Sequence, residues 1–152
     1  MGTTFDLSPA GVGAEYAASG LICIGREVAS FTRASDTMTL TARGLQGTTA
    51  VAHSVNDVAQ VCLSYTAQRP CDVVSDLLTT YAGVDAAYID TTAWQAENDR
   101  WVPSIKMTTL ITKPTGVASL IGEICQHGLL IWWDEIAQEI RYRANRPLDY
   151  NE

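Results

Sequence analysis

Apolar and polar side chains alternate along the first half of the chain, which predicts β-strands. In residues 37–42, Met38 and Leu40 alternate with threonines. This period of two is typical of a strand with one buried face. Further extended segments are expected at residues 21–24, 27–32 and 58–65, with a hairpin turn at residues 34–36. The pattern therefore predicts a small antiparallel β module over residues 21–66.

Beyond residue 70 the apolar residues recur at helical spacing. Asp72 is expected to cap a first helix, and Gly83 to end it. Thr92 and Gln95 match a capping box, which predicts the start of a second, short helix. Because these signals replace the strand pattern, a second module is expected to begin here.

The strongest helix signal lies between Pro114 and Gly128. Apolar residues there fall at positions i, i+3, i+4, i+7 and i+8, on one face of a helix. A strand is expected before this helix at residues 105–111, and a hairpin after it with strands at residues 129–133 and 139–143. We predict an α+β fold in which residues 70–146 form a module of two main helices on a mixed or antiparallel sheet.

Neither end of the chain shows such a period. Residues 1–20 are rich in Gly, Ala, Ser and Thr, so a flexible arm is expected there, and residues 147–152 are expected to form a short tail. The abrupt start also suggests that the chain is a piece of a longer protein.

The charge balance limits the classes of partner. The 152 residues include ten Lys and Arg against 17 Asp and Glu, a net charge of −7. Because the basic residues are scattered, no nucleic acid or anionic membrane is expected as a partner. The longest apolar run, Leu129–Trp133, is far shorter than the about 20 residues that cross a bilayer. Since no signal peptide is recognised either, the sequence predicts a protein that is made and kept inside a cell.

Four cysteines occur without any C-x-x-C spacing. Two disulfides would be one interpretation in a secreted protein. Cys23, Cys62 and Cys125 lie within apolar segments, however. We therefore predict reduced thiols that pack as small buried hydrophobes.

The stretch from Arg43 to His53 is the most informative for local structure. Gly44 and Gly47 lie three residues apart at a strand end, which indicates a positive φ or a close approach of the backbone. Thr48 is suited to bond the backbone of this turn, and His53 to tie down the loop that follows. Because no nucleophile accompanies His53, a structural role is favoured over that of a catalytic base.

This stretch and the strand before it resemble a module that recurs in phage tail and baseplate proteins. That module contains an I-G-x-E strand, then R-G, G-T and a His, and then a valine-led strand. The glycine usual near the turn after the His is replaced here by Asn56-Asp57, and Asn tolerates the left-handed conformation. The matching positions are Gly25, Glu27, Arg43, Gly44, Gly47, Thr48 and His53, followed by residues 58–63.

The second half is similar to the continuation of the same tail proteins. Together the two resemblances cover about residues 20–145. They imply a virion structural role, as in tail-tip hub, minor tail or baseplate proteins, and they imply no reaction and no cofactor. The matching positions are residues 72–78, Trp94 with Glu97 and Trp101, residues 112–114, and residues 131–134 before Ile140 and Arg141.

The four tryptophans leave a glycan-binding function open, because sugars stack on exposed indoles. Trp132 and Trp133 are adjacent on a predicted strand and therefore point to opposite faces. This predicts one of them in the core and the other at a contact surface. Trp94 and Trp101 are expected to be buried.

Neighbouring carboxylates are the remaining candidates for chemistry. Glu97 with Asp99, or Asp134 with Glu135, would be the pair of a glycoside hydrolase. Such neighbours in a polar loop are usually solvated, and no metal-ligand spacing or phosphate loop occurs. We therefore predict no enzymatic activity, no metal and no cofactor.

The sequence thus predicts a non-enzymatic structural component of a phage or prophage tail, located in the virion tail and in the host cytoplasm during assembly. Its expected partners are other tail or baseplate proteins. The full-length parent is expected to form a homo-oligomeric ring, most simply a trimer, and the isolated chain a monomer or weak oligomer. The alternative is a glycan- or peptidoglycan-binding module at the tail tip, with or without hydrolysis.

Overall fold

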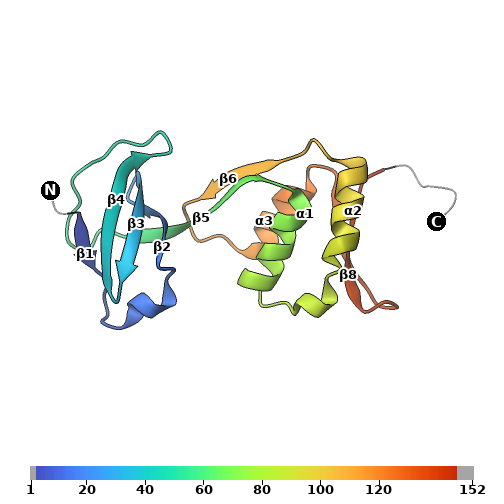
Figure 1. Ribbon diagram of the computed structural model, residues 1–152, viewed down its shortest axis with the longest axis horizontal. Coiled ribbons are helices and arrows are strands. Elements are labelled where there is room, and N and C mark those ends of the chain that lie inside the picture. Colours follow the sequence, from blue (N-terminus) through green and yellow to red (C-terminus); the bar gives the residue numbers. More distant parts are fainter. Residues whose placement is uncertain (1–2, 147–152) are drawn as a thin grey trace. The chain divides into compact units, whose positions relative to one another are not determined.

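The computed structural model describes residues 3–146 (Figure 1). These residues form an antiparallel six-stranded sheet, a separate two-stranded sheet and three α-helices, which confirms the predicted α+β fold. Contacts divide the chain into two compact units. The first unit contains the residues up to Ser64 together with Leu110–Pro114, and the second contains Tyr65–Thr109 and the residues from Thr115 onward.

The strands predicted in the first half are all present. The turn around Ser35, where φ is 54°, joins two of them as expected. Ile22, Phe31 and Met38 are buried in the core of this sheet. The six strands, in the order β1-β4-β3-β2-β5-β6 across the sheet, are β1 (Thr4–Asp6), β2 (Ser19–Ile24), β3 (Glu27–Ala34), β4 (Thr37–Leu45), β5 (Ala59–Gln68) and β6 (Met107–Ile111).

The prediction of a loose arm over residues 1–20 is wrong for the part that the structure describes. Strand β1 pairs antiparallel with β4 at the edge of the sheet. The Asp36 carboxylate accepts hydrogen bonds from the amides of Gly11 and Gly13 at 2.7 and 2.8 Å, and these bonds lower its pKa. The Asp36 side chain, from the β3–β4 turn, thus helps to fix a segment whose own composition carries no periodic signal. The predicted tail at residues 147–152 lies outside the described residues.

The second unit is built on helices that pack side by side. Helix α1 (Pro70–Asp76) continues into a π-helical turn, η2 (Leu77–Tyr81), and contacts both α2 (Thr91–Trp101) and α3 (Val117–Cys125) (Figure 1). A short 3-10 turn, η3 (Ala86–Tyr88), precedes α2.

Both predicted N-terminal caps of these helices are wrong. Asp72 lies in the first turn of α1, where Pro70 begins the helix. Helix α2 is capped by Asp90, whose carboxylate accepts the amide proton of Ala93 at 2.9 Å. The expected capping residue Gln95 instead donates to Asp72 at 2.9 Å. Several Asp and Thr residues precede this helix, and the sequence pattern alone does not single out the one that caps it.

The chain closes with the predicted hairpin, β7 (Leu129–Asp134) and β8 (Glu139–Ala144), which pair antiparallel. Helix α2 packs against β8 (Figure 1). There, Trp94 stacks on Tyr142 with ring centroids 5.4 Å apart. Trp94 is buried as expected, whereas Trp101 is only partly buried.

The cysteines do not follow the expected order of burial. Cys71 is the buried one, and burial raises the pKa of its thiol to about 11. Cys23, Cys62 and Cys125 are only half-buried, although they were expected inside the core because of their apolar neighbours. Their neighbours in sequence alternate between faces or helical positions, so an apolar segment does not bury every member.

Candidate functional site

Four of the seven motif positions in the first half, Glu27 included, meet around one buried carboxylate. Glu27 lies on β3, and its side chain is 1% exposed. Arg43, on the neighbouring β4, donates two hydrogen bonds to this carboxylate. Its Nε lies 2.8 Å from Oε1 and its Nη2 lies 2.5 Å from Oε2. Two parallel charge-assisted bonds of this kind are among the strongest in proteins, because the planar guanidinium matches the carboxylate.

Backbone amides and a histidine complete the shell around Glu27. The amides of Gly44 and Val51 donate to its two oxygens at 3.3 and 3.0 Å. His53 Nε2 lies 2.8 Å from Oε2. We call these residues (Glu27, Arg43, Gly44, Val51 and His53) the Glu27 cluster.

The cluster fixes the ionisation of Glu27. The hydrogen bonds from Arg43 lower its pKa most, burial opposes them, and the bonds from Val51, His53 and Gly44 add to the lowering, so that the pKa falls to about 2. The same pairing raises the pKa of Arg43. An ionised carboxylate only accepts hydrogen bonds, so His53 Nε2 carries a proton and donates it.

The cluster ties the loop after β4 to the sheet. His53 Nδ1 lies 3.5 Å from the carboxylate of Asp57, which also accepts the Ser54 amide at 2.8 Å. Arg43 in addition donates to the carbonyl of Val51. His53 therefore lies where the predicted role of holding this loop requires it, between Glu27 and Asp57. Asp57 and Val51 were not selected from the sequence, because a loop residue beside the motif carries no periodic signal.

The turn glycines and Thr48 behave as their spacing indicated. Gly44 and Gly47 have φ values of 63° and 75°. A Cβ on Gly44 would also lie 3.1 Å from the Ala50 nitrogen, whereas nothing crowds Gly47. Thr48 Oγ1 accepts the amide of Val28 at 3.0 Å and donates to the carbonyl of Leu45 at 2.7 Å.

Gly25 and Asn56 hold the remaining turns of the motif. Gly25 has φ 61° and joins β2 to β3 without entering the Glu27 cluster. Asn56 has φ 75°, as expected for a residue that replaces a glycine. The matched positions of the first half thus form one local structure rather than scattered features.

The Glu27 cluster is suited to holding structure and not to chemistry. Its two carboxylate oxygens already accept five N–H groups, and the side chain is shielded from solvent. A general acid or base must reach a substrate proton, which this carboxylate does not.

The other predicted contact residues lie on the hairpin. Trp132 and Trp133 are 43% and 48% exposed, so the expectation that one of them lies in the core is wrong. They do point to opposite faces, but Trp133 lies near the hairpin tip, where it meets Tyr88 edge to face with ring centroids 5.6 Å apart. Leu130 and Ile136 add further exposed apolar surface. Strand β7 is thus buried at its first residue, Leu129, and exposed at Trp132 and Trp133 near its end.

Three of the four candidate hydrolytic carboxylates are occupied by structural bonds, and the fourth, Glu135, is exposed. Glu97 accepts the Ala144 amide and Arg146 Nε, both at 3.1 Å. Asp99 pairs with Arg69 at 3.0 Å. Asp134 accepts the amides of two residues in the hairpin turn together with Arg141 Nε, and these bonds lower its pKa.

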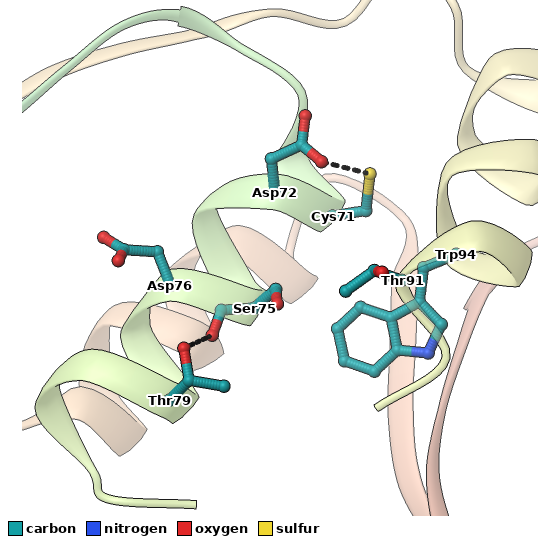
Figure 2. Close-up of a pocket in the computed structure, with 7 residues that line it drawn as sticks. All are labelled: Cys71, Asp72, Ser75, Asp76, Thr79, Thr91 and Trp94. Atoms are coloured by element: carbon teal, nitrogen blue, oxygen red, sulfur yellow. Dashed lines mark hydrogen bonds between the residues drawn. The ribbon is translucent and has the colours of Figure 1, made fainter. Parts of the chain in front are cut away.

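A hollow of about 200 Å³ lies between α1 and the start of α2 (Figure 2). Trp94 forms one wall, and the Asp76 carboxylate points away from its ring (Figure 2). Asp76 accepts bonds from Tyr65 and Thr80, each at 2.7 Å, and Asp72 accepts from Arg69 and Gln95. The hollow therefore offers hydroxyl groups but no uncommitted carboxylate pair. Its lining residues are Cys71, Asp72, Ser75, Asp76, Thr79, Thr91 and Trp94.

Within residues 3–146, no group of three or more His, Cys, Asp or Glu side chains is arranged to hold a metal ion. No helix in this part of the chain is long and apolar enough to span a membrane. Comparisons with family models, with curated proteins and with solved structures find no match to the chain.

Proposed function

We propose that the chain is a structural domain of a phage or prophage tail, in the tail-tip hub or baseplate, and that it acts through protein–protein contacts. The observation that supports this most is the Glu27 cluster. Four of the residues that carry the resemblance to tail modules, Glu27, Arg43, Gly44 and His53, are distant in sequence or on different strands, yet hydrogen bonds to Glu27 join them. A motif whose positions have structural roles supports the proposal more strongly than a match of residue types alone.

The exposed apolar residues of the hairpin supply a surface for such contacts. Trp132, Trp133 and Tyr88 are between 43% and 48% exposed, and Ile136 is 98% exposed. Large aromatic residues are enriched at protein interfaces and dominate their energetics. An assembly domain needs such a surface, whereas an isolated domain gains nothing from it.

The proposal is tested in the source organism. Deleting the gene should leave particles without complete tails by electron microscopy, and mass spectrometry of wild-type particles should detect the protein. Light scattering should show the isolated chain as a monomer or weak oligomer and the full-length parent as a ring. Normal tails from the deletion strain, or purified particles that lack the protein, would exclude the assignment.

Glycan binding by the same hairpin is the second candidate. It is favoured by the two half-exposed indoles, since sugars stack on such rings. Titration with peptidoglycan fragments should then quench tryptophan fluorescence in the native chain, and Trp132→Ala or Trp133→Ala should abolish the quenching. If no fragment changes the fluorescence, only the assembly function is retained.

A further inference from the structure

The outer edge of β7 has main-chain groups without partners. The Gly128 carbonyl accepts the Asn145 amide at 2.7 Å, and the next pair in the register is Leu129 with Ala144. Hydrogen-bonded pairs alternate along an antiparallel ladder, so the N–H and C=O groups of Leu129, Ile131 and Trp133 point away from β8. No group among the described residues bonds them.

On the opposite edge of the same hairpin, main-chain groups of β8 do have hydrogen-bond partners. The Ile140 carbonyl accepts Trp94 Nε1 at 3.1 Å, and the Ala144 amide donates to Glu97 at 3.1 Å. Ile140 also forms an isolated parallel bridge with Ile89. The fold therefore covers β8 with side chains and backbone from α2 and its preceding loop, and leaves β7 open.

Strand β7 lacks the features that protect an edge. Its sequence is Leu-Leu-Ile-Trp-Trp-Asp, and its single charge, Asp134, lies at the end and pairs with Arg141. Edge strands are normally blocked by Lys, Pro, a bulge or a covering element, because an open apolar edge pairs with other chains. The register of β7 with β8 is continuous over all six residues, without a bulge.

The charge near this edge indicates which chain fits it. The second unit contains twelve acidic and six basic residues, so it holds −6 of the net charge of −7. Glu135, beside the end of β7, and Glu123, on the adjacent α3, are exposed. Arg141, opposite Trp132 on β8, pairs with Asp134 and Glu139. Like charges would oppose the pairing of two copies along this edge, whereas basic side chains on an incoming strand would be attracted.

We propose that the edge of β7 binds an extended segment of a partner protein that alternates apolar and basic residues, as an additional strand of the hairpin sheet. Main-chain bonds to Ile131 and Trp133 would provide the affinity, because Leu129 is only 2% exposed, and apolar side chains beside Leu130 and Trp132 would provide the specificity. This inference rests on the proposed assembly function, because it names the surface and the kind of partner.

The test uses two synthetic peptides and the native chain. One peptide alternates Val and Lys, and the other alternates Val and Glu. In fluorescence anisotropy at low salt, the Lys peptide should bind at least about tenfold more tightly than the Glu peptide. Ile131→Pro should reduce that binding by at least about tenfold, because proline removes an outward amide without removing a bond to β8. Ile136→Ser, at the exposed hairpin tip, is the matched control and should bind normally.

Amide hydrogen exchange by NMR gives a result that does not depend on the variants. The amides of Ile131 and Trp133 should exchange fast in the free protein and slowly with the Lys peptide. Slow exchange in the free monomer, equal binding of both peptides, or unchanged binding by folded Ile131→Pro would each overturn the proposal. Protection that appears through dimerisation would assign the edge to a second copy instead. Particles that lack the protein would exclude the tail assignment while leaving these peptide results unaffected.

Discussion

The Glu27 cluster and the β7–β8 hairpin differ in which groups they bury and which they expose to solvent. The cluster buries a charge and satisfies it completely with Arg43, His53 and two amides. The hairpin leaves large apolar side chains and a strand edge in solvent. A buried charge without all its partners would be costly, whereas an exposed apolar surface is tolerated until a partner covers it.

We expect the Glu27 cluster to act on stability and the hairpin to act on association. Substitutions in the cluster are expected to change the free energy of unfolding without an effect on peptide binding. Substitutions of exposed hairpin residues are expected to impair association and to leave the free energy of unfolding nearly unchanged.

Glu27→Gln should cause the largest loss of stability. The amide leaves the Arg43 guanidinium without its charge partner and turns one acceptor into a donor that faces Arg43, Val51 or His53. Removing one member of a buried ion pair typically costs about 3–5 kcal/mol. Urea unfolding at neutral pH, followed by circular dichroism, measures this cost. A loss below about 1 kcal/mol would mean that the cluster does not hold the fold.

Acid should remove part of the same stabilisation. The pKa of Glu27 is about 2 in the folded protein against an ordinary value of 4.5. Because the pKa of Glu27 is lower in the folded state, its ionisation stabilises the folded protein at pH values above the unfolded pKa. This contribution is lost as the pH falls from about 4.5 toward about 2.

The matched measurement compares native protein and Glu27→Gln across this acidic range. The free energy of unfolding should fall more steeply with acid in the native protein. Asp36, Asp72 and Asp134 also have lowered pKa values, but they are present in both proteins, so their contribution cancels in the difference. Parallel curves would show that Glu27 does not titrate as described.

The two turn glycines should differ from each other. Gly47→Val introduces a β-branched residue at positive φ, with an expected cost of about 1–3 kcal/mol. Gly44→Val should cost more, since its Cβ would also crowd the Ala50 nitrogen at 3.1 Å. Thermal melts rank the two variants, with Ser54→Ala as a control that should melt like the native protein. An equal, small effect of all three substitutions would contradict the strained-turn interpretation.

The sequence predicts local structure well where residues close together in the chain determine it. The alternation around Met38 gives a strand, and the glycine spacing gives turns with positive φ, because both depend on neighbours in the chain. The partners of Glu27 could not be derived in this way. Arg43 and His53 reach it only after β3 and β4 pair, although each was selected through the resemblance.

Other features depend on contacts that no local pattern encodes. Asp36 orders the segment around Gly11 and Gly13 from 25 and 23 residues away. The sequence assigns the cap of α2 to Thr92 because Ser, Thr, Asp and Asn compete as caps, whereas in the structure Asp90 accepts the Ala93 amide. The exposure of Trp132 and Trp133 was missed because alternation predicts which face a residue takes, and not whether that face is covered.

Removing the exposed apolar surface should leave stability nearly unchanged. Ile136 is 98% exposed and Trp132 is 43% exposed, so the folded monomer gains little from burying either side chain. The double variant Trp132→Ser and Ile136→Ser should therefore unfold within about 1 kcal/mol of the native protein in urea. In an assembled tail the same two residues would be buried by a neighbour, and truncating a buried aromatic contact typically costs about 2 kcal/mol or more in binding. The variant should thus fold normally but fail to enter particles, as measured by mass spectrometry of purified tails from a complemented deletion strain. If it unfolds far more easily than the native protein, these side chains belong to the core of the second unit. The contrast between the cluster and the hairpin would then be lost.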